Sequence, residues 1–301
     1  MAEIQSPQSI DEVIARLRDQ RYLGDRRLAT AIYLGIRLGR PVFIEGEPGV
    51  GKTEAAKAMA AVLGARLIRL QCHEGIDLAQ AAYEWNYARQ LLHIRLLDEA
   101  GDRSRAEKDI FGPEFLLRRP LLEAIDNDDP QPPVLLIDEI DRSDEEFEAY
   151  LLELLSDFQI SIPELGTITA RRPPFVVLTS NRTREIHDAL KRRCLYVWID
   201  YPDLEKEVAI VRARAPEVAG QLAREVAALV HALREQDLYK IPGVAETVDW
   251  ARSLAALGAT SLDPVLVDAT LGAALKYQED LERTRGLLPS LIAQAQGRAR
   301  D

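Results

Sequence analysis

The residues with the clearest potential for chemistry form one short glycine-rich stretch. It consists of Gly46, Glu47, Pro48, Gly49, Val50, Gly51, Lys52 and Thr53. An apolar run, Pro41–Ile44, precedes it and an Ala-rich segment, Glu54–Leu63, follows, which predicts a strand, a loop and a helix in succession. Glycines let backbone N–H groups turn toward an anion, and a helix N-terminus adds a favourable dipole. We therefore expect a phosphate-binding loop in which Lys52 reaches the outer phosphates and the Thr53 hydroxyl binds Mg²⁺.

Two acidic residues follow the most apolar run of the chain. Val134–Ile137 is typical of a central strand of a parallel sheet, buried on both faces, and Asp138 and Glu139 come directly after it. Hydrolysis of a nucleotide needs a phosphate cradle, a metal ligand, an activated water and positive charge at the transition state. Asp138 is placed to hold the magnesium shell beside Thr53, and Glu139 to polarise the attacking water.

Three further residues are candidates for contact with the terminal phosphate or the water. Asn181 follows the predicted strand Phe175–Leu178, where its amide could orient the water, although an asparagine that stabilises a turn is an equally good interpretation. Arg192 and Arg193 precede the last predicted strand, and on their own they indicate a solvated basic edge. No Asn-Lys-x-Asp element for guanine follows the glycine loop, so ATP is the expected nucleotide.

The elements that must position these residues alternate between strands and helices. Two helices are expected in residues 5–40, and a capping box of Ser143 and Glu146 predicts the start of a helix. Residues 79–108 fit neither period and are treated as an insertion. The other expected elements are strands at 65–72 and 195–199, a hairpin at 160–168, and helices only from residue 203 onward, with a loosely held tail after Arg283. This order predicts an α/β domain with a mainly parallel sheet, ending near residue 202.

Composition excludes several classes of protein. The 301 residues are 47% hydrophobic and 29% charged, as in an ordinary soluble protein, and no run approaches the roughly 18 apolar residues of a membrane span. The N-terminus lacks a basic segment followed by an apolar one, so a cytoplasmic location is expected. Cys72 and Cys194 are expected to be buried thiols. A net charge of −11 argues against a non-specific grip on nucleic acid.

The order of these motifs resembles that of AAA+ ATPases, and most of all their MoxR branch, over roughly residues 15–280. The stretches Asp138–Arg142, Thr179–Arg182 and Lys191–Tyr196 also resemble the CoxD-like accessory ATPases for maturation of the carbon monoxide dehydrogenase that contains molybdenum and copper. The resemblance implies an α/β P-loop core, residues 1–202, with a central parallel sheet flanked by helices. A small all-helical lid, residues 203–301, would follow it.

The resemblance also implies roles for the residues. The glycine loop would be Walker A, Asp138 and Glu139 Walker B, and Asn181 sensor 1, acting on ATP and Mg²⁺. Arg192 matches the arginine that reaches the site of a neighbouring subunit, with Arg193 the adjacent candidate. An arginine supplied in this way accelerates hydrolysis on the order of a thousandfold or more in comparable systems. A homo-oligomeric ring, usually a hexamer, would act on a metalloenzyme client beside a partner with a von Willebrand factor A domain.

One departure from the MoxR pattern concerns the lid. The pattern has an arginine in a Gly-x-Ser-Pro-Arg stretch, whereas the nearest match here, Gly243–Thr247, has none. Either Arg252, on the same predicted helix, is the substitute or the lid has no such arginine. The hairpin at 160–168 and the insertion at 79–108 are the segments expected to face the client. The motifs identify neither the client nor the number of subunits.

Three other functions compete with this interpretation. A magnesium chelatase-like motor subunit shares the core and also works with a partner. A nucleotide-dependent module for DNA processing or regulation is opposed by the acidic net charge. A scaffold that binds nucleotide without hydrolysis is opposed by Glu139 following Asp138.

Overall fold

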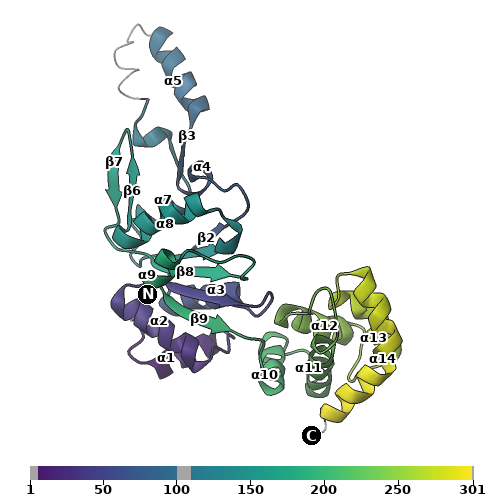
Figure 1. Ribbon diagram of the computed structural model, residues 1–301. Coiled ribbons are helices and arrows are strands. Elements are labelled where there is room, and N and C mark those ends of the chain that lie inside the picture. Colours follow the sequence, from purple (N-terminus) through teal and green to yellow (C-terminus); the bar gives the residue numbers. More distant parts are fainter. Residues whose placement is uncertain (1–5, 100–109, 300–301) are drawn as a thin grey trace. The chain divides into compact units, whose positions relative to one another are not determined.

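The computed structural model describes residues 6–99 and 110–299. The chain divides into two compact units (Figure 1). The sheet unit contains Met1–Val13, Arg26–Glu45 and Met59–Val197, and the lid unit contains Ile14–Asp25, Gly46–Ala58 and Trp198–Asp301. The glycine loop is thus grouped with the C-terminal helices. The domain boundary near residue 202 stays a prediction.

A five-stranded sheet confirms the predicted α/β class. Its strand order is β2-β5-β8-β1-β9. Strands β2 and β5, β5 and β8, and β8 and β1 pair in parallel, so their carboxyl ends lie at one edge, where Gln71 is opposite Asp138 and Glu45 is opposite Ser180. The strands are β1 (Val42–Gly46), β2 (Leu67–Gln71), β5 (Val134–Asp138), β8 (Phe175–Ser180) and β9 (Leu195–Ile199).

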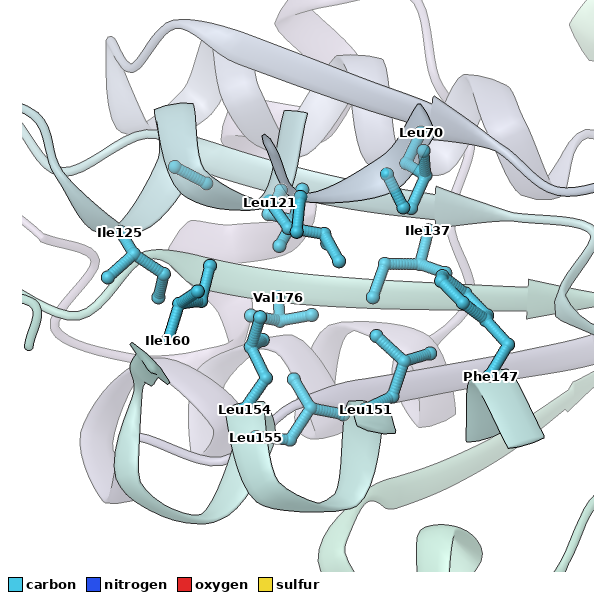
Figure 2. Close-up of a cluster of buried hydrophobic side chains, with 14 of the residues drawn as sticks. Leu70, Leu121, Ile125, Ile137, Phe147, Leu151, Leu154, Leu155, Ile160 and Val176 are labelled. Atoms are coloured by element: carbon cyan, nitrogen blue, oxygen red, sulfur yellow. The ribbon is translucent and has the colours of Figure 1, made fainter. Parts of the chain in front are cut away.

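Two helices bury their apolar faces against this sheet. Figure 2 shows Leu121 and Ile125 of α7 (Pro120–Ile125) and Leu151 of α8 (Glu145–Asp157) beside Ile137 and Val176 of the strands.

The predicted N-terminal helices are confirmed as α1 (Ile10–Asp19) and α2 (Arg26–Leu38). The glycine loop continues into α3 (Lys52–Leu63), and α9 (Asp188–Arg193) precedes β9.

The predicted start of α8 is wrong by one residue. The N-cap is Asp144, whose side chain accepts the Phe147 N–H at 2.9 Å, whereas the Ser143 hydroxyl donates to Ile140 O at 2.8 Å. Ser143 closes the short 3-10 turn η2 (Ile140–Arg142), which leaves the capping role to the carboxylate that follows.

The described residues of the predicted insertion, 79–99, are mostly regular structure. They include most of α4 (Leu78–Ala81), β3 (Tyr83–Trp85) and α5 (Tyr87–Glu99). The 3-10 turn η1 (Pro113–Phe115) and β4 (Leu116–Arg118) follow the insertion, and β4 pairs antiparallel with β3. Residues 100–109 of the predicted insertion lie outside the described residues. Helix α5 exposes Tyr87, Leu91, Leu92 and Leu96.

The predicted hairpin is confirmed as β6 (Gln159–Ile162) and β7 (Gly166–Thr169), with Ile160 opposite Ile168.

The C-terminal part of the lid unit is helical, as predicted. Its helices are α10 (Leu204–Arg214), α11 (Gly220–Arg234), α12 (Val244–Ala256), α13 (Pro264–Thr270), the 3-10 turn η3 (Leu271–Ala273) and α14 (Gln278–Arg298). The expectation of a loose tail is wrong for its described residues, because Leu288, Leu291 and Ile292 of α14 are buried in the core of this unit. Over the described ranges, no helix combines the length and the apolarity that crossing a membrane would need.

Candidate nucleotide site

The glycine loop has the backbone that phosphate binding requires. Gly49 has φ 77° and Gly51 has φ 95°, conformations in which a residue with a side chain would be strained. Lys52 begins α3, and its buried ammonium donates to Gly46 O at 2.8 Å and to Glu47 O at 2.7 Å. The lysine side chain therefore folds back over the loop, and its contact with a phosphate stays a prediction.

The loop also contacts the start of lid helix α12 through backbone alone. The Val244 N–H donates to Gly49 O at 2.9 Å. A Cβ built on Gly49 would lie 2.8 Å from the Gly243 Cα, and one built on Gly243 would lie 2.7 Å from the Gly49 Cα. Tyr201 adds a side-chain contact, because its hydroxyl donates to Pro48 O at 3.1 Å. Glycine is thus required on both sides of this contact.

A buried ion pair supports this contact from within the lid unit. Glu207 of α10 accepts from Arg234 Nη1 at 2.6 Å, from Arg234 Nη2 at 2.8 Å and from Thr247 Oγ1 at 2.6 Å. Arg234 Nε donates to Pro242 O at 2.9 Å, directly before Gly243. Burial alone would raise the pKa of Glu207, but the hydrogen bonds from His231, Arg234 and Thr247 and the Arg234 charge outweigh it and hold that pKa below its ordinary value.

The lid arginine of the MoxR pattern has no equivalent at the start of α12. Thr247 takes the place of that arginine and is bonded to Glu207. The substitute from sequence, Arg252, pairs with Glu217 at 3.1 Å and donates to Arg214 O. The Arg252 side chain is therefore bonded to the last residue of α10 and to the segment that follows it, and not to the glycine loop.

In the sheet unit, Asp138 ends β5 and is almost fully buried. Its Oδ1 accepts from Thr179 Oγ1 of the neighbouring strand β8, and its Oδ2 accepts from Arg69 Nη2 at 2.6 Å and Nε at 2.9 Å. Thr179 Oγ1 also accepts the Glu139 N–H at 3.0 Å. One hydroxyl therefore fixes both acidic residues at the end of β5.

Glu139 and Asn181 come together at the same edge of the sheet. Glu139 has φ 56° and ψ 51°, the left-handed region, which is rare for a residue with a side chain and stores strain. Asn181 Nδ2 donates to Glu139 Oε1 at 3.4 Å. The structure thus brings Glu139 and Asn181 into contact, although they are 42 positions apart in the sequence.

The two arginine candidates differ in their contacts. Arg193 Nε donates to Ser156 Oγ at 2.7 Å and its Nη1 donates to Ala189 O at 3.1 Å. The Arg192 side chain is exposed and makes neither a hydrogen bond nor an ion pair with any residue in the described ranges. Of the pair, Arg192 is the one whose guanidinium is available to another molecule.

The donor set suits a magnesium ion that arrives with a nucleotide. Among the described residues, no group of three or more His, Cys, Asp or Glu side chains could cage a metal. Mg²⁺ in phosphate sites keeps several waters and uses one or two protein oxygens beside the phosphates. The Thr53 hydroxyl and the Asp138 carboxylate, each taken by itself, are hard oxygen donors of this kind.

Sequence reasoning missed three members of these networks. Arg69 and Arg234 carry no motif that distinguishes them from ordinary strand and helix residues, and Thr179 was given no role of its own although it begins the Thr179–Arg182 stretch. Thr179 precedes Asn181 by two positions, which places it on the strand edge that ends at the candidate site. The pairing of Arg234 with Glu207 spans 27 residues and left no local signal.

Comparisons with known proteins agree with the fold. The sequence model of the AAA domain, dynein-related subfamily, matches residues 41–194, more than half of the chain. No curated protein sequence matches the chain.

Solved structures resemble it at low identity. Thermotoga maritima RuvB, a Holliday junction branch migration motor, is 19% identical with a TM-score of 0.47, over 95% of this chain and 78% of that one. A point mutant of that protein is 20% identical with a TM-score of 0.49, over 96% of this chain and 80% of that one. A candidate ATPase from Cytophaga hutchinsonii is 16% identical with a TM-score of 0.46, over 95% of this chain and 93% of that one. At these scores the structural matches carry no argument about function.

Proposed function

Because the chain belongs to the AAA domain family, dynein-related subfamily, we propose that it is a magnesium-dependent ATP hydrolase that works as a ring of identical subunits. The observation that carries the proposal is the group at the end of β5 and β8: a buried Asp138 and a strained Glu139, joined by one threonine hydroxyl, with Asn181 on the glutamate. This group has the acids and the amide that hydrolysis of a phosphoric anhydride requires.

Each residue has one task in this proposal. The N–H groups of the glycine loop and Lys52 bind the phosphates of ATP, and Thr53 and Asp138 hold its magnesium ion, which supplies positive charge against the phosphate oxygens. Glu139 accepts the proton of the attacking water as general base, and Asn181 orients the glutamate through the contact at 3.4 Å. Arg69 and Thr179 hold the Asp138 carboxylate in a single orientation.

The remaining charge comes from a second subunit. Arg192 is exposed and lacks an ion partner among the described residues, so its guanidinium is available to stabilise the transition state in the site of a neighbour. Arg193, bonded to Ser156 and Ala189 O, is the less suitable of the two. A hexamer is the expected ring.

Two variants test the division between binding and hydrolysis. Lys52→Ala removes the ammonium that reaches the phosphates, so a fluorescent ATP analogue should no longer bind. Glu139→Gln should bind the analogue within about threefold of wild type, while hydrolysis falls by roughly a hundredfold or more. Equal loss of binding in both variants would contradict the role given to Glu139.

Mixed rings test the role of Arg192. Subunits with Arg192→Ala keep a complete nucleotide site, and subunits with Lys52→Ala keep the arginine. Each variant alone should be inactive, and mixing them should restore part of the activity, because a Lys52→Ala subunit can complete the site of its neighbour. Absence of recovery, with mixed assembly verified by native mass spectrometry, would contradict the assignment.

The wider role we propose is that of a MoxR-type chaperone that remodels a metalloenzyme, in the manner of the CoxD-like accessory ATPases, beside a partner with a von Willebrand factor A domain. The exposed leucines of α5 and the hairpin β6–β7 support it, since both leave side chains exposed that a client could contact. Deleting the hairpin should stop maturation of the client and leave basal ATP hydrolysis intact. Unchanged maturation would contradict this wider role. It would leave a magnesium chelatase-like motor as the alternative.

A further inference from the structure

Arg40 lies in the turn between α2 and β1 and contacts the end of α9. Its Nη2 donates to Arg192 O at 2.8 Å and to Cys194 O at 3.2 Å, and its Nε donates to Arg193 O at 3.2 Å. One guanidinium therefore binds three consecutive carbonyl groups. The first two residues of this stretch are the two arginine candidates, Arg192 and Arg193.

The backbone around Arg40 is itself held in place. The Arg40 N–H donates to Gly35 O at 3.1 Å, which ends α2, and Gly39 has φ 63° to allow the chain to reverse there. On the other side, the Leu195 N–H donates to Pro41 O at 2.8 Å. The Arg40 guanidinium thus extends from a point that is connected both to the end of α2 and to the start of β9.

The last carbonyls of α9 need donors that the helix cannot supply. The helix has only six residues, and within it Lys191 O already accepts the Cys194 N–H at 3.0 Å. Carbonyls at a helix end carry partial negative charge, and a planar guanidinium with several fixed N–H groups can satisfy more than one of them. A lysine ammonium at the same place would carry the positive charge but would lack the planar set of N–H donors that bonds several carbonyls at once.

This capping has a consequence for the two arginines of α9. With the Arg192 and Arg193 carbonyls bound by Arg40, the peptide group that follows each of these residues is fixed. The Arg193 side chain is held against Ser156 and Ala189 O. The Arg192 side chain then leaves the helix from a rigid backbone with no bond to its own sheet unit among the described residues.

We propose that Arg40 is a positioning residue for Arg192, fixing the backbone from which that arginine reaches the nucleotide site of a neighbouring subunit. The proposal rests on the function proposed above. Displacement of a transition-state contact by about 1 Å costs on the order of a hundredfold in rate. Loss of Arg40 should therefore lower hydrolysis only in the site of the neighbour, and leave nucleotide binding in its own site unchanged.

Mixed rings separate these two sites. One mixture contains Lys52→Ala subunits, which donate Arg192, and Arg192→Ala subunits, which bind ATP. Arg40→Ala is added either to the donor or to the ATP-binding subunit, and ring mass and binding of a fluorescent ATP analogue are measured for both mixtures. We expect hydrolysis to fall about tenfold to a hundredfold when the donor carries Arg40→Ala, and to stay within about twofold when the other subunit carries it.

Two further variants define the cause. Arg37→Ala removes a positive charge from the neighbouring helix α2 and serves as the control, with hydrolysis expected within twofold in either arrangement. Arg40→Lys in the donor should give an intermediate rate, because it keeps the charge and loses the fork. Equal effects of Arg40→Ala in both arrangements, or none in either, would overturn the positioning role. If the unmodified mixture is inactive while wild type hydrolyses ATP, the role of Arg192 in the neighbouring site fails, and that of Arg40 with it.

Discussion

The glycine loop and the edge of the sheet at Asp138 differ in what determines their geometry. At the loop, the features that matter are backbone: two positive φ angles and a contact between Gly49 and Gly243 that leaves no space for a Cβ. At the sheet edge they are side chains: Arg69, Thr179 and Asn181 bonded to Asp138 and Glu139. Substitutions at the loop should therefore act through shape and substitutions at the edge through individual hydrogen bonds, which the following variants test.

The largest effect is expected beneath the loop, at Arg234. Arg234→Ala leaves the buried Glu207 carboxylate without its main partner, at a cost of about 3–5 kcal/mol in the free energy of unfolding. Urea unfolding of wild type and Arg234→Ala measures this loss in the free energy of unfolding. The double variant Arg234→Met with Glu207→Leu removes both charges and should recover most of the loss. If the double variant is as unstable as Arg234→Ala, packing rather than the ion pair is the cause.

Gly49→Ala tests the backbone contact directly. A Cβ there would lie 2.8 Å from the Gly243 Cα at φ 77°, so we expect affinity for an ATP analogue to fall by roughly a hundredfold, about 2.7 kcal/mol. Gly75→Ala is the matched control: its φ is 75°, and a Cβ there would meet nothing within 4 Å. Similar binding by the two variants would show that the Gly243 contact is unimportant.

Thr179→Val tests the edge of the sheet. It removes the hydroxyl between Asp138 and the Glu139 N–H, so we expect a loss of about 1–3 kcal/mol in stability and a fall of about tenfold in hydrolysis, with nucleotide affinity nearly unchanged. Thr183→Val, which breaks a hydrogen bond of 2.7 Å to Asp141, is the control and should alter stability more than hydrolysis. Equal loss of hydrolysis in both would remove the special role of Thr179.

A smaller effect concerns pH. The pKa of Glu207 is lowered below its ordinary 4.5, so its ionised form stabilises the fold above that pH, and the stabilisation is lost as pH falls through the folded-state pKa. The stability of wild type relative to Glu207→Gln should therefore shrink as the pH falls below about 4.5. Denaturant unfolding at several pH values measures it. A constant difference would show that Glu207 does not titrate with folding.

The smallest effect is expected at Arg252. Its ion pair with Glu217 is about half exposed, and exposed pairs contribute between roughly 0 and 1 kcal/mol. Arg252→Ala should leave ATP hydrolysis within about twofold of wild type. A hundredfold loss of ATP hydrolysis would show that Arg252 acts as the lid arginine and contacts the nucleotide through its side chain.

Most of the sheet was predictable from local sequence. The continuous apolar run before Asp138 and the glycines before Lys52 each determine a local structure, and the structure contains both. The capping of α8 differs by one residue because Ser143 and Asp144 are both good caps, and the turn before them decides between the two. The tail after Arg283 was misjudged because its Ala, Gln and Arg content concealed a buried stripe at Leu288, Leu291 and Ile292.

The contacts that support the candidate site were not predictable from one sequence. Arg40 and Arg193 are 153 positions apart, and Arg69 and Asp138 are 69 apart, so neither pair leaves a periodic or local pattern. Glu139 in a left-handed conformation was equally hidden, since glutamate has no preference for it. The sequence therefore gave candidates for the residues that carry the chemistry, which stay predictions, and little information about which residues hold those candidates in place.

The two cysteines provide the protein with natural reporters of local opening. Cys72 follows β2, next to Asp138, and Cys194 ends α9, next to Arg40; both are buried, and burial raises the pKa of each thiol to about 12. Only the thiolate form of a cysteine attacks a thiol-modifying reagent, so at neutral pH neither sulfur should react until its segment opens. The labelling rate at Cys72 then measures local opening at the edge of the sheet. The labelling rate at Cys194 measures local opening of the segment that follows Arg192 and Arg193. Neither measurement needs an engineered probe.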